Sequence, residues 1–122
     1  MTDKRSIPII DLFAGPGGLG EGFSSLRERG NQRFQIALSI EKDQRAHTTL
    51  RLRSFVRQFK VAFPDEYYSF LRDTGTEQGV RLQSLYDSYP KEAAAAESEA
   101  WQVELGQVGH DLVSTRIDSA ID

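Results

Sequence analysis

The sequence contains no cysteine among its 122 residues. This absence excludes disulfides, thiolate metal ligands and any reaction that needs a thiol nucleophile from this chain. Histidine is nearly as scarce, since only His47 and His110 occur, and neither has an acidic partner at the spacing of a metal site. We therefore expect no metal centre, and we expect both histidines to be surface or capping residues.

The chain also lacks long apolar runs and a strong charge of either sign. No stretch is long enough to span a membrane, and the opening MTDKRSIPII has no apolar core of signal-peptide length. We therefore expect a cytoplasmic protein without a membrane partner. The formal net charge of -3 provides no overall basic field for a phosphate backbone. Any contact with nucleic acid would be local or made by another part.

The first forty residues show the pattern of strand, tight loop, helix and strand. Residues 7–13 are almost continuously apolar, which is typical of a parallel strand covered on both faces, with Pro8 near its start. Behind a glycine-rich loop, apolar residues recur at the spacing of one helix face, namely Leu19, Phe23 and Leu26. Gly30 lies where a left-handed residue would end that helix, and residues 34–40 alternate like a second strand. This order predicts an α/β fold.

The remaining residues are dominated by helical signals. Residues 43–60 carry an apolar stripe, and three cations occupy a neighbouring face, namely Arg53, Arg57 and Lys60. We expect this face to be solvated, because two or three surface cations are ordinary for a helix. Residues 64–105 lose the strand signals, and their last part, 91–105, is an alanine-rich helix between Pro90 and Gly106. A final helix would begin behind Asp111 as its N-cap.

The glycine-rich loop carries the strongest functional signal. Gly15, Gly17 and Gly20 fit the pattern G-x-G-x-x-G, and Glu41 follows at the end of the second strand. Glycines let an anion approach backbone N–H groups at a helix start, and an acidic residue there accepts hydrogen bonds from ribose hydroxyls. Both NAD and S-adenosylmethionine carry an adenosine ribose, so these residues leave both cofactors open. Alternatively, Glu41 caps the next helix together with Asp43.

A longer motif around this loop resembles a known family. Asp11 and Leu12 precede Phe13-Ala14-Gly15-Pro16-Gly17-Gly18, and this run resembles the first motif of the C5 cytosine DNA methyltransferases. The resemblance implies a Rossmann-like half-domain in which Phe13 lies on the adenine side of S-adenosylmethionine and the loop wraps its methionine portion. Glu41 resembles the ribose-binding second motif. The implied cofactor-binding residues are Phe13, Ala14, Gly15, Pro16, Gly17, Gly18, Leu19, Glu41 and Lys42.

One position departs from the family pattern, and one motif has no clear counterpart. Lys42 stands where family members often place an aromatic residue that stacks on adenine. The acidic residue that reaches the adenine amino group in the family is not evident, and neither Asp111 nor Asp118 is favoured for it. We expect Asp11 to brace the loop by accepting N–H groups. One branch of the family has a helical insert that ends like Trp101–Gly106.

The family's nucleophile is missing. Its members attack C6 of a flipped cytosine with the thiolate of a Pro-Cys loop, and this chain has no cysteine. We therefore expect no catalytic residue here and no activity of the chain alone. The resemblance implies DNA as partner of the complete enzyme, with a second chain or a missing carboxy-terminal part that supplies the catalytic loop and the target-recognition domain.

These observations lead to one interpretation and two alternatives. We expect residues 1–60 to form a cofactor-binding β-α-β-α unit, 61–106 a helical insertion, and 107–122 a helix leading to the missing catalytic region. The chain would serve a DNA (cytosine-5) methyltransferase of a restriction-modification system. A dinucleotide-dependent oxidoreductase fragment would instead place a third parallel strand soon after the second helix. A non-catalytic interaction subunit with a vestigial cofactor scaffold is the third possibility.

Overall fold

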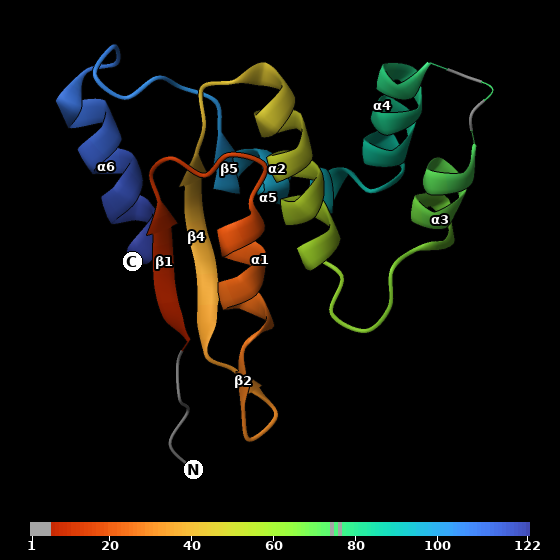
Figure 1. The fold of residues 1–122 in the computed structure, drawn as a ribbon, viewed down its shortest axis with the longest axis horizontal. Helices are drawn as coiled ribbons and strands as arrows, with labels where there is room; N and C mark the ends of the chain where they lie inside the picture. Colours follow the sequence, from red (N-terminus) through yellow and green to blue (C-terminus); the bar gives the residue numbers. More distant parts are fainter. Residues whose placement is uncertain (1–5, 74, 76) are drawn as a thin grey trace.

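The computed structural model describes residues 6–73, 75 and 77–122, and Figure 1 shows their arrangement. In chain order the elements are β1 (Ile7–Asp11), α1 (Gly18–Ser25), β2 (Arg27–Glu28), β3 (Asn31–Gln32), β4 (Phe34–Ile40), α2 (Gln44–Arg57), α3 (Asp65–Arg72), α4 (Gln78–Ser88), α5 (Pro90–Glu99), β5 (Ala100–Trp101) and α6 (His110–Ile121). None of the helices in this described part is long and apolar enough to cross a membrane.

The main sheet is parallel and three-stranded, in the order β1-β4-β5. Ile7 of β1 pairs with Phe34, and the register shifts between Ile9 and Ile10. Ser39 near the end of β4 pairs with Ala100 of β5. The three parallel strands are neighbours in the same order as they occur in the chain, which is the arrangement of one half of a doubly wound sheet. The expected α/β fold with parallel strands and flanking helices is confirmed.

All three parallel strands end at the same edge of the sheet. The glycine-rich loop after β1, the connection from β4 to α2 and the segment after β5 meet at the top of Figure 1. In that view α1 and α2 lie in front of the sheet, while α3 and α4 lie to its right. In open parallel sheets ligands bind at this carboxyl edge.

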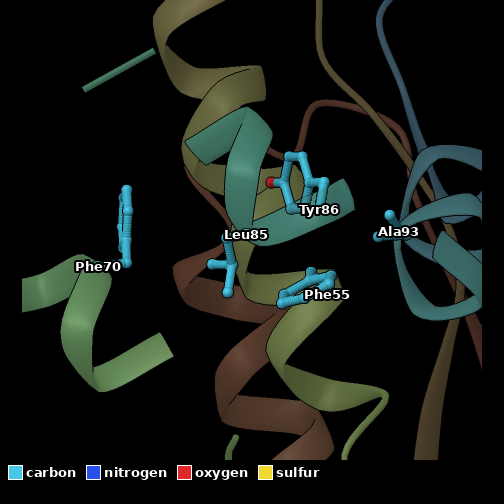
Figure 2. Packing of buried hydrophobic residues seen from close by; sticks show 6 residues of the cluster. Phe55, Phe70, Leu85, Tyr86 and Ala93 are labelled. Carbon is cyan, nitrogen blue, oxygen red and sulfur yellow. The ribbon is translucent and has the colours of Figure 1, made fainter. Parts of the chain in front are cut away.

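The largest apolar cluster joins α2 to the helical segment after it. Figure 2 shows Phe55 of α2 next to Leu85 and Tyr86 of α4, with Phe70 on one side of this group and Ala93 on the other. The Phe55 and Tyr86 rings meet edge to face with centroids 5.0 Å apart. Burial raises the pKa of Tyr86 to about 12, although the Arg51 guanidinium over its ring opposes the rise. Helices α3 and α4 are thus joined to the sheet through α2 and α5, and α5 itself contacts β4 and β5.

The helix after the glycine loop is shorter than expected. It ends at Ser25, and Gly30 forms the turn of a hairpin between β2 and β3 together with Arg29. Arg29 has φ 52° and Gly30 has φ 82°, which suits a two-residue turn of type I′. Gly30 is left-handed as expected, but it closes a hairpin and does not cap a helix. Leu26 has the spacing of a helix face, but the pairing of β2 with β3 ends the helix before it.

The expected helix over residues 91–105 is also wrong at its end. Residues 100 and 101 form β5, parallel to β4, and Ala100 is only 2% exposed. Pairing with a buried strand outweighs the helix propensity of the alanine-rich segment. The last helix begins at His110 with Gly109 as N-cap, so Asp111 lies in its first turn and is not the cap.

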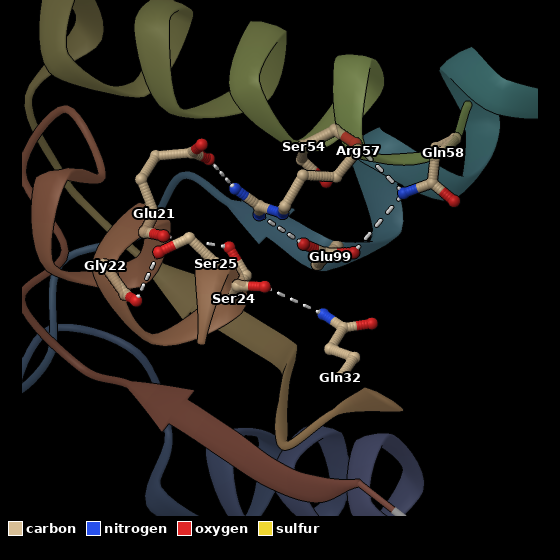
Figure 3. Close-up of polar contacts among 9 residues, drawn as sticks. All are labelled: Glu21, Gly22, Ser24, Ser25, Gln32, Ser54, Arg57, Gln58 and Glu99. Carbon is tan, nitrogen blue, oxygen red and sulfur yellow. Dashed lines mark hydrogen bonds and ion pairs between the residues drawn. The ribbon is translucent and has the colours of Figure 1, made fainter. Parts of the chain in front are cut away.

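We expected the cations of α2 to lie on a solvated surface, but Arg57 does not. Its side chain is 18% exposed and pairs with Glu21 of α1 and with Glu99 of α5, the latter at 2.6 Å. Figure 3 shows this arrangement, with the Gln58 amide as a further partner of Glu99. Sequence spacing missed this role because both carboxylates come from helices distant in the chain. The three helices α1, α2 and α5 are therefore joined by one guanidinium.

Candidate functional site

The loop between β1 and α1 takes a backbone path that requires glycine. Gly15 has φ 57° and Gly17 has φ 94°, in the left-handed region that side chains disfavour. The N–H of Ala14, directly before Gly15, donates to the Ile40 carbonyl at the end of β4, with 2.9 Å between the atoms. The loop is thus fixed to the carboxyl edge of the sheet.

Two glycines of the G-x-G-x-x-G pattern also lie in close contact with neighbouring elements. A Cβ atom on Gly17 would lie 3.0 Å from Cδ1 of Leu50 in α2. A Cβ on Gly20 would lie 3.4 Å from Cδ1 of Ile36 in β4. A side chain at Gly17 would force Leu50 to shift, and the contact at Gly20 allows close packing of α1 on the sheet.

The amino end of α1 is open at this loop. Gly17 is its N-cap and provides no side-chain hydrogen bond. The first N–H groups of a helix lack intrahelical acceptors and carry partial positive charge. A Cβ on Gly18, the first helical residue, would meet nothing within 4 Å. Bare amides and free space at one helix start are suited to an anionic group.

Glu41 connects the glycine loop to the start of α2 and to the end of β5. Its Oε1 accepts the Gly15 N–H at 3.0 Å and its Oε2 accepts the Asp43 N–H at 2.8 Å. Its own N–H donates to the Trp101 carbonyl at 3.1 Å, at the end of β5. Asp43 in turn caps α2 by accepting the Ala46 N–H at 2.9 Å. Each Glu41 oxygen retains a second acceptor position, because a carboxylate has about four lone-pair sites.

Asp11 lies beside Glu41 at the end of β1. Burial raises the pKa of the Asp11 carboxyl, the hydrogen bond from the Phe13 N–H lowers it, and the nearby Glu41 charge raises it again. The bond to Phe13 is the loop-bracing role expected of Asp11.

Apolar side chains surround the loop. Phe13 is 81% exposed and Leu19 is 68% exposed, whereas Ala14 is buried in a cluster with Leu50 of α2 and Ala100 of β5. Pro16 is exposed at the turn. The predicted residues from Phe13 to Leu19 therefore lie with Glu41 at one edge of the sheet, and they include two large apolar side chains open to contact.

Lys42 turns toward residues that the sequence interpretation missed. Its Nζ lies 3.5 Å from Oε1 of Glu104, and its carbonyl accepts a hydrogen bond from the Gln102 amide at 3.4 Å. Gln102 and Glu104 follow β5 at this same edge, whereas Asp111 and Asp118 are exposed on α6. The alternation of Trp101, Val103 and Leu105 was the signal for an extended segment here, and the helix prediction hid it.

Neither histidine lies in a metal-binding group. His47 is half-buried and its Nε2–H donates to the Ala100 carbonyl at 2.9 Å, so it holds α2 to β5 and is not a surface residue. His110 is exposed at the start of α6. Across residues 6–73, 75 and 77–122, no three His, Cys, Asp or Glu side chains are grouped to hold a metal ion.

Comparison with known proteins finds one informative relative. The chain is 29% identical over 110 residues to the Type II methyltransferase M.Bpa9945I of Bacillus paralicheniformis. It is similar to a methyltransferase. The matched region covers 88% of this chain but 23% of the relative, so the chain spans about a quarter of that protein. No family model and no solved structure matches the chain.

The arrangement defines the chemistry that the edge can perform. Bare amides at the start of α1 suit an anion, and Glu41 beside them suits a donor such as a sugar hydroxyl. Phe13 and Leu19 offer apolar contact to a flat or aliphatic group. The chain supplies no thiolate, so the edge can bind and orient a ligand but cannot provide a cysteine nucleophile.

Proposed function

We propose that this chain is the S-adenosylmethionine-binding amino-terminal part of a DNA (cytosine-5) methyltransferase. The observation that carries the proposal is the contact of Glu41 with Gly15, which brings the predicted ribose acceptor against the glycine loop. The similarity to a Type II methyltransferase supports methyl transfer. The motif Phe13–Gly18 supports the cytosine-5 class, in which the bound sulfonium supplies the methyl group.

The residues present fit such a cofactor. The loop is open at Gly15 and Gly18, where a Cβ would meet nothing within 4 Å, and its amides would receive the amino-acid end. The free acceptor positions of Glu41 would receive the ribose hydroxyls, and Phe13 would cover one side of the adenine. Lys42 is paired with Glu104, so in this proposal the segment Gln102–Glu104 bounds the adenine side in place of a stacking aromatic.

The cysteine nucleophile and the DNA-binding surface of the reaction would come from residues outside this chain. The attack on C6 of cytosine needs a thiolate, which a second chain or a further part of the enzyme would supply together with the target-recognition domain. DNA would bind mainly to that other part, because the chain has a formal charge of -3. We infer a cytoplasmic restriction-modification enzyme, in which this chain alone is inactive.

One alternative has an observation in its favour. A dinucleotide-dependent oxidoreductase would also use the G-x-G-x-x-G loop and Glu41, and β5 provides the third parallel strand that such a fold requires. In this chain, however, β5 follows three helices and does not come soon after α2. The methyltransferase relative favours the first proposal.

Ligand binding to the 122-residue chain tests the proposal directly. We expect weak binding of S-adenosylhomocysteine and no binding of NADH, measured by saturation-transfer NMR and equilibrium dialysis. The Glu41→Ala variant should bind S-adenosylhomocysteine at least about tenfold more weakly, because it loses a charged acceptor near the ribose.

The matched control is Glu28→Ala, because Glu28 lies in the hairpin at the other end of the sheet. This variant should bind the ligand as the parent chain does. Binding of NADH in preference to S-adenosylhomocysteine would favour the oxidoreductase. An unchanged affinity of the Glu41→Ala variant would contradict the proposed site.

A further inference from the structure

The strand β1 is less buried than its composition predicts. The four residues from Ile7 to Ile10 are apolar, yet none of the five residues of β1 is fully buried. In the neighbouring strand β4, four of the seven residues are buried. Strands of parallel sheets are normally covered on both faces, and apolar runs are typical of such covered strands. The strand β1 therefore has the composition of an interior strand but the position of an edge strand.

One side of β1 is unpaired. The strand pairs with β4, and it has no strand on its other side within the part of the chain that the structure describes. The Ile7 N–H donates to the Arg33 carbonyl on the β4 side, at 2.9 Å. Backbone groups of successive residues point to opposite sides of an extended strand, so the N–H of Ile10 points to the free side. Pro8 faces this side with a carbonyl alone. Unpaired backbone groups on an apolar strand are a template for another strand.

Helix α6 lies on the face of the sheet opposite to α1. Ile36 of β4 faces α1, since its Cδ1 lies 3.4 Å from the position of a Cβ on Gly20. The next residue, Ala37, lines a groove of about 890 Å³ together with Ala120 and Ile121 of α6. Successive side chains of a strand point to opposite faces of the sheet. Figure 3 agrees with this placement, because α1 lies above β1 in that view and α6 lies below it.

The face on which α6 lies indicates the direction of the connection to which it belongs. Connections between parallel strands are right-handed in nearly all proteins. Helix α1 belongs to the connection that leads from β1 to β4, in the direction of β5. Helix α6 follows β5 on the opposite face, so a right-handed connection through α6 runs back across the sheet toward β1. A parallel strand reached in this way lies on the free side of β1.

We propose that the free side of β1 binds a parallel strand from the part of the enzyme that lies outside this chain. This inference rests on the proposed function and adds to it the surface on which the two parts meet. The length of the methyltransferase relative supports such an occupant, because this chain spans only 23% of it. The apolar composition of β1 matches the interior strands of a larger parallel sheet.

This position of the new strand also connects the docking surface to the ligand site. The strand order would reverse between β1 and the new strand, and open parallel sheets bind ligands in the crevice at such a reversal, beyond the carboxyl ends of the strands. Phe13, which is 81% exposed, lies just beyond the carboxyl end of β1. The docked part would therefore form the second wall of the crevice and cover this side chain.

The test supplies the missing part as a separate polypeptide. The probe is the region of the Bacillus paralicheniformis methyltransferase outside its match to this chain, and its binding is measured by titration calorimetry. Ile7→Lys puts a charge on the edge strand at a side chain that is 42% exposed, remote from the glycine loop. We expect the parent chain to bind the probe and this variant to bind it at least about tenfold more weakly, because charged side chains on an edge strand oppose pairing.

Leu71→Lys is the matched control, because Leu71 is 56% exposed in α3, away from β1. This variant should bind the probe as the parent does. Thermal unfolding followed by circular dichroism checks that both variants keep the fold. No binding of the probe by the parent chain, or equal affinities of the two lysine variants, would overturn the proposal.

Hydrogen exchange of single amides, followed by NMR, locates the contact without a substitution. We expect the Ile10 amide to exchange at least about tenfold more slowly in the complex with the probe than in the chain alone. The Ile9 amide points toward β4 and should be protected in both states. Unchanged exchange of Ile10 in the complex would contradict docking at this edge. Protection of Ile10 that rises with the concentration of the chain alone would identify a second copy as the occupant, and would also overturn the proposal.

The docking proposal and the proposed function fail in different ways. If the chain binds S-adenosylhomocysteine in a manner that depends on Glu41 but the probe does not protect Ile10, only the docking surface is wrong. If the probe protects Ile10 but neither the chain nor the complex binds S-adenosylhomocysteine, the proposed cofactor is wrong.

Discussion

Single residues at the glycine loop show how backbone conformation and packing act together. Gly17 has a left-handed backbone, and a Cβ added to it would lie 3.0 Å from Cδ1 of Leu50. A Cβ added to the adjacent Gly18 would meet nothing within 4 Å. We expect Gly17→Ala to destabilise the chain by about 1–3 kcal/mol, since it adds strain and a clash. Gly18→Ala should be neutral or slightly stabilising because alanine favours the helix. Urea unfolding of both variants measures the difference, and equal stabilities would contradict this view of the loop.

Asp11 is a single residue whose carboxyl makes the stability of the fold depend on pH. Its pKa in the folded chain is raised, chiefly by burial, above the value of 3.8 that applies when it is exposed. The folded state therefore holds the proton more tightly, and stability falls as pH rises from 3.8 through the folded pKa. We expect Asp11→Asn to melt at a higher temperature than the parent at pH 7, and the difference to disappear at acidic pH. Asp118→Asn on α6 is the control and should melt like the parent at pH 7.

At the scale of elements, one guanidinium joins three helices. Removing Arg57 leaves Glu99, whose side chain is 16% exposed, without its principal cation. We expect Arg57→Gln to lower the free energy of unfolding by about 1–3 kcal/mol, because a largely buried carboxylate loses its partner. Arg33→Gln breaks the exposed pair with Glu28 and should cost less than about 1 kcal/mol. Equal losses in urea unfolding would show that the network of Figure 3 does not hold the helices together.

The elements that could be predicted from the sequence are those with local signals. The periodicity of residues 7–40 predicts strand, loop, helix and strand, and the structure has them in that order. The hairpin was missed because its turn places Arg29, a residue that seldom adopts positive φ, in the left-handed region. The strand β5 was missed because the helix propensity of the preceding alanine run hid the extended signal that begins at Trp101, and because its partner lies far away in the chain. Arg57 was misjudged for the same reason, since pairing with distant carboxylates leaves no local pattern.

Over the whole molecule, stability is unevenly distributed. Helix α2 carries Leu50, Ser54 and Phe55, all nearly inaccessible, whereas α6 has no buried residue. Local opening costs least where few apolar contacts are broken. We expect the backbone amides of α6 to exchange with deuterium well before those of the middle of α2, as measured by mass spectrometry or NMR. Similar exchange rates for α6 and α2 would contradict this distribution.

The position of β5 in the chain has a consequence for how the protein forms during synthesis. Ala100 pairs with Ser39, so the third strand leaves the ribosome only after the four intervening helices, α2 to α5, have been made. Closing so long a segment is entropically slow compared with local contacts. The nascent chain therefore carries its glycine turn and the Glu41 side chain before the Trp101 carbonyl is there to hold the Glu41 backbone. We expect the carboxyl edge of the sheet to mature late, after the helices between its two outer strands have folded.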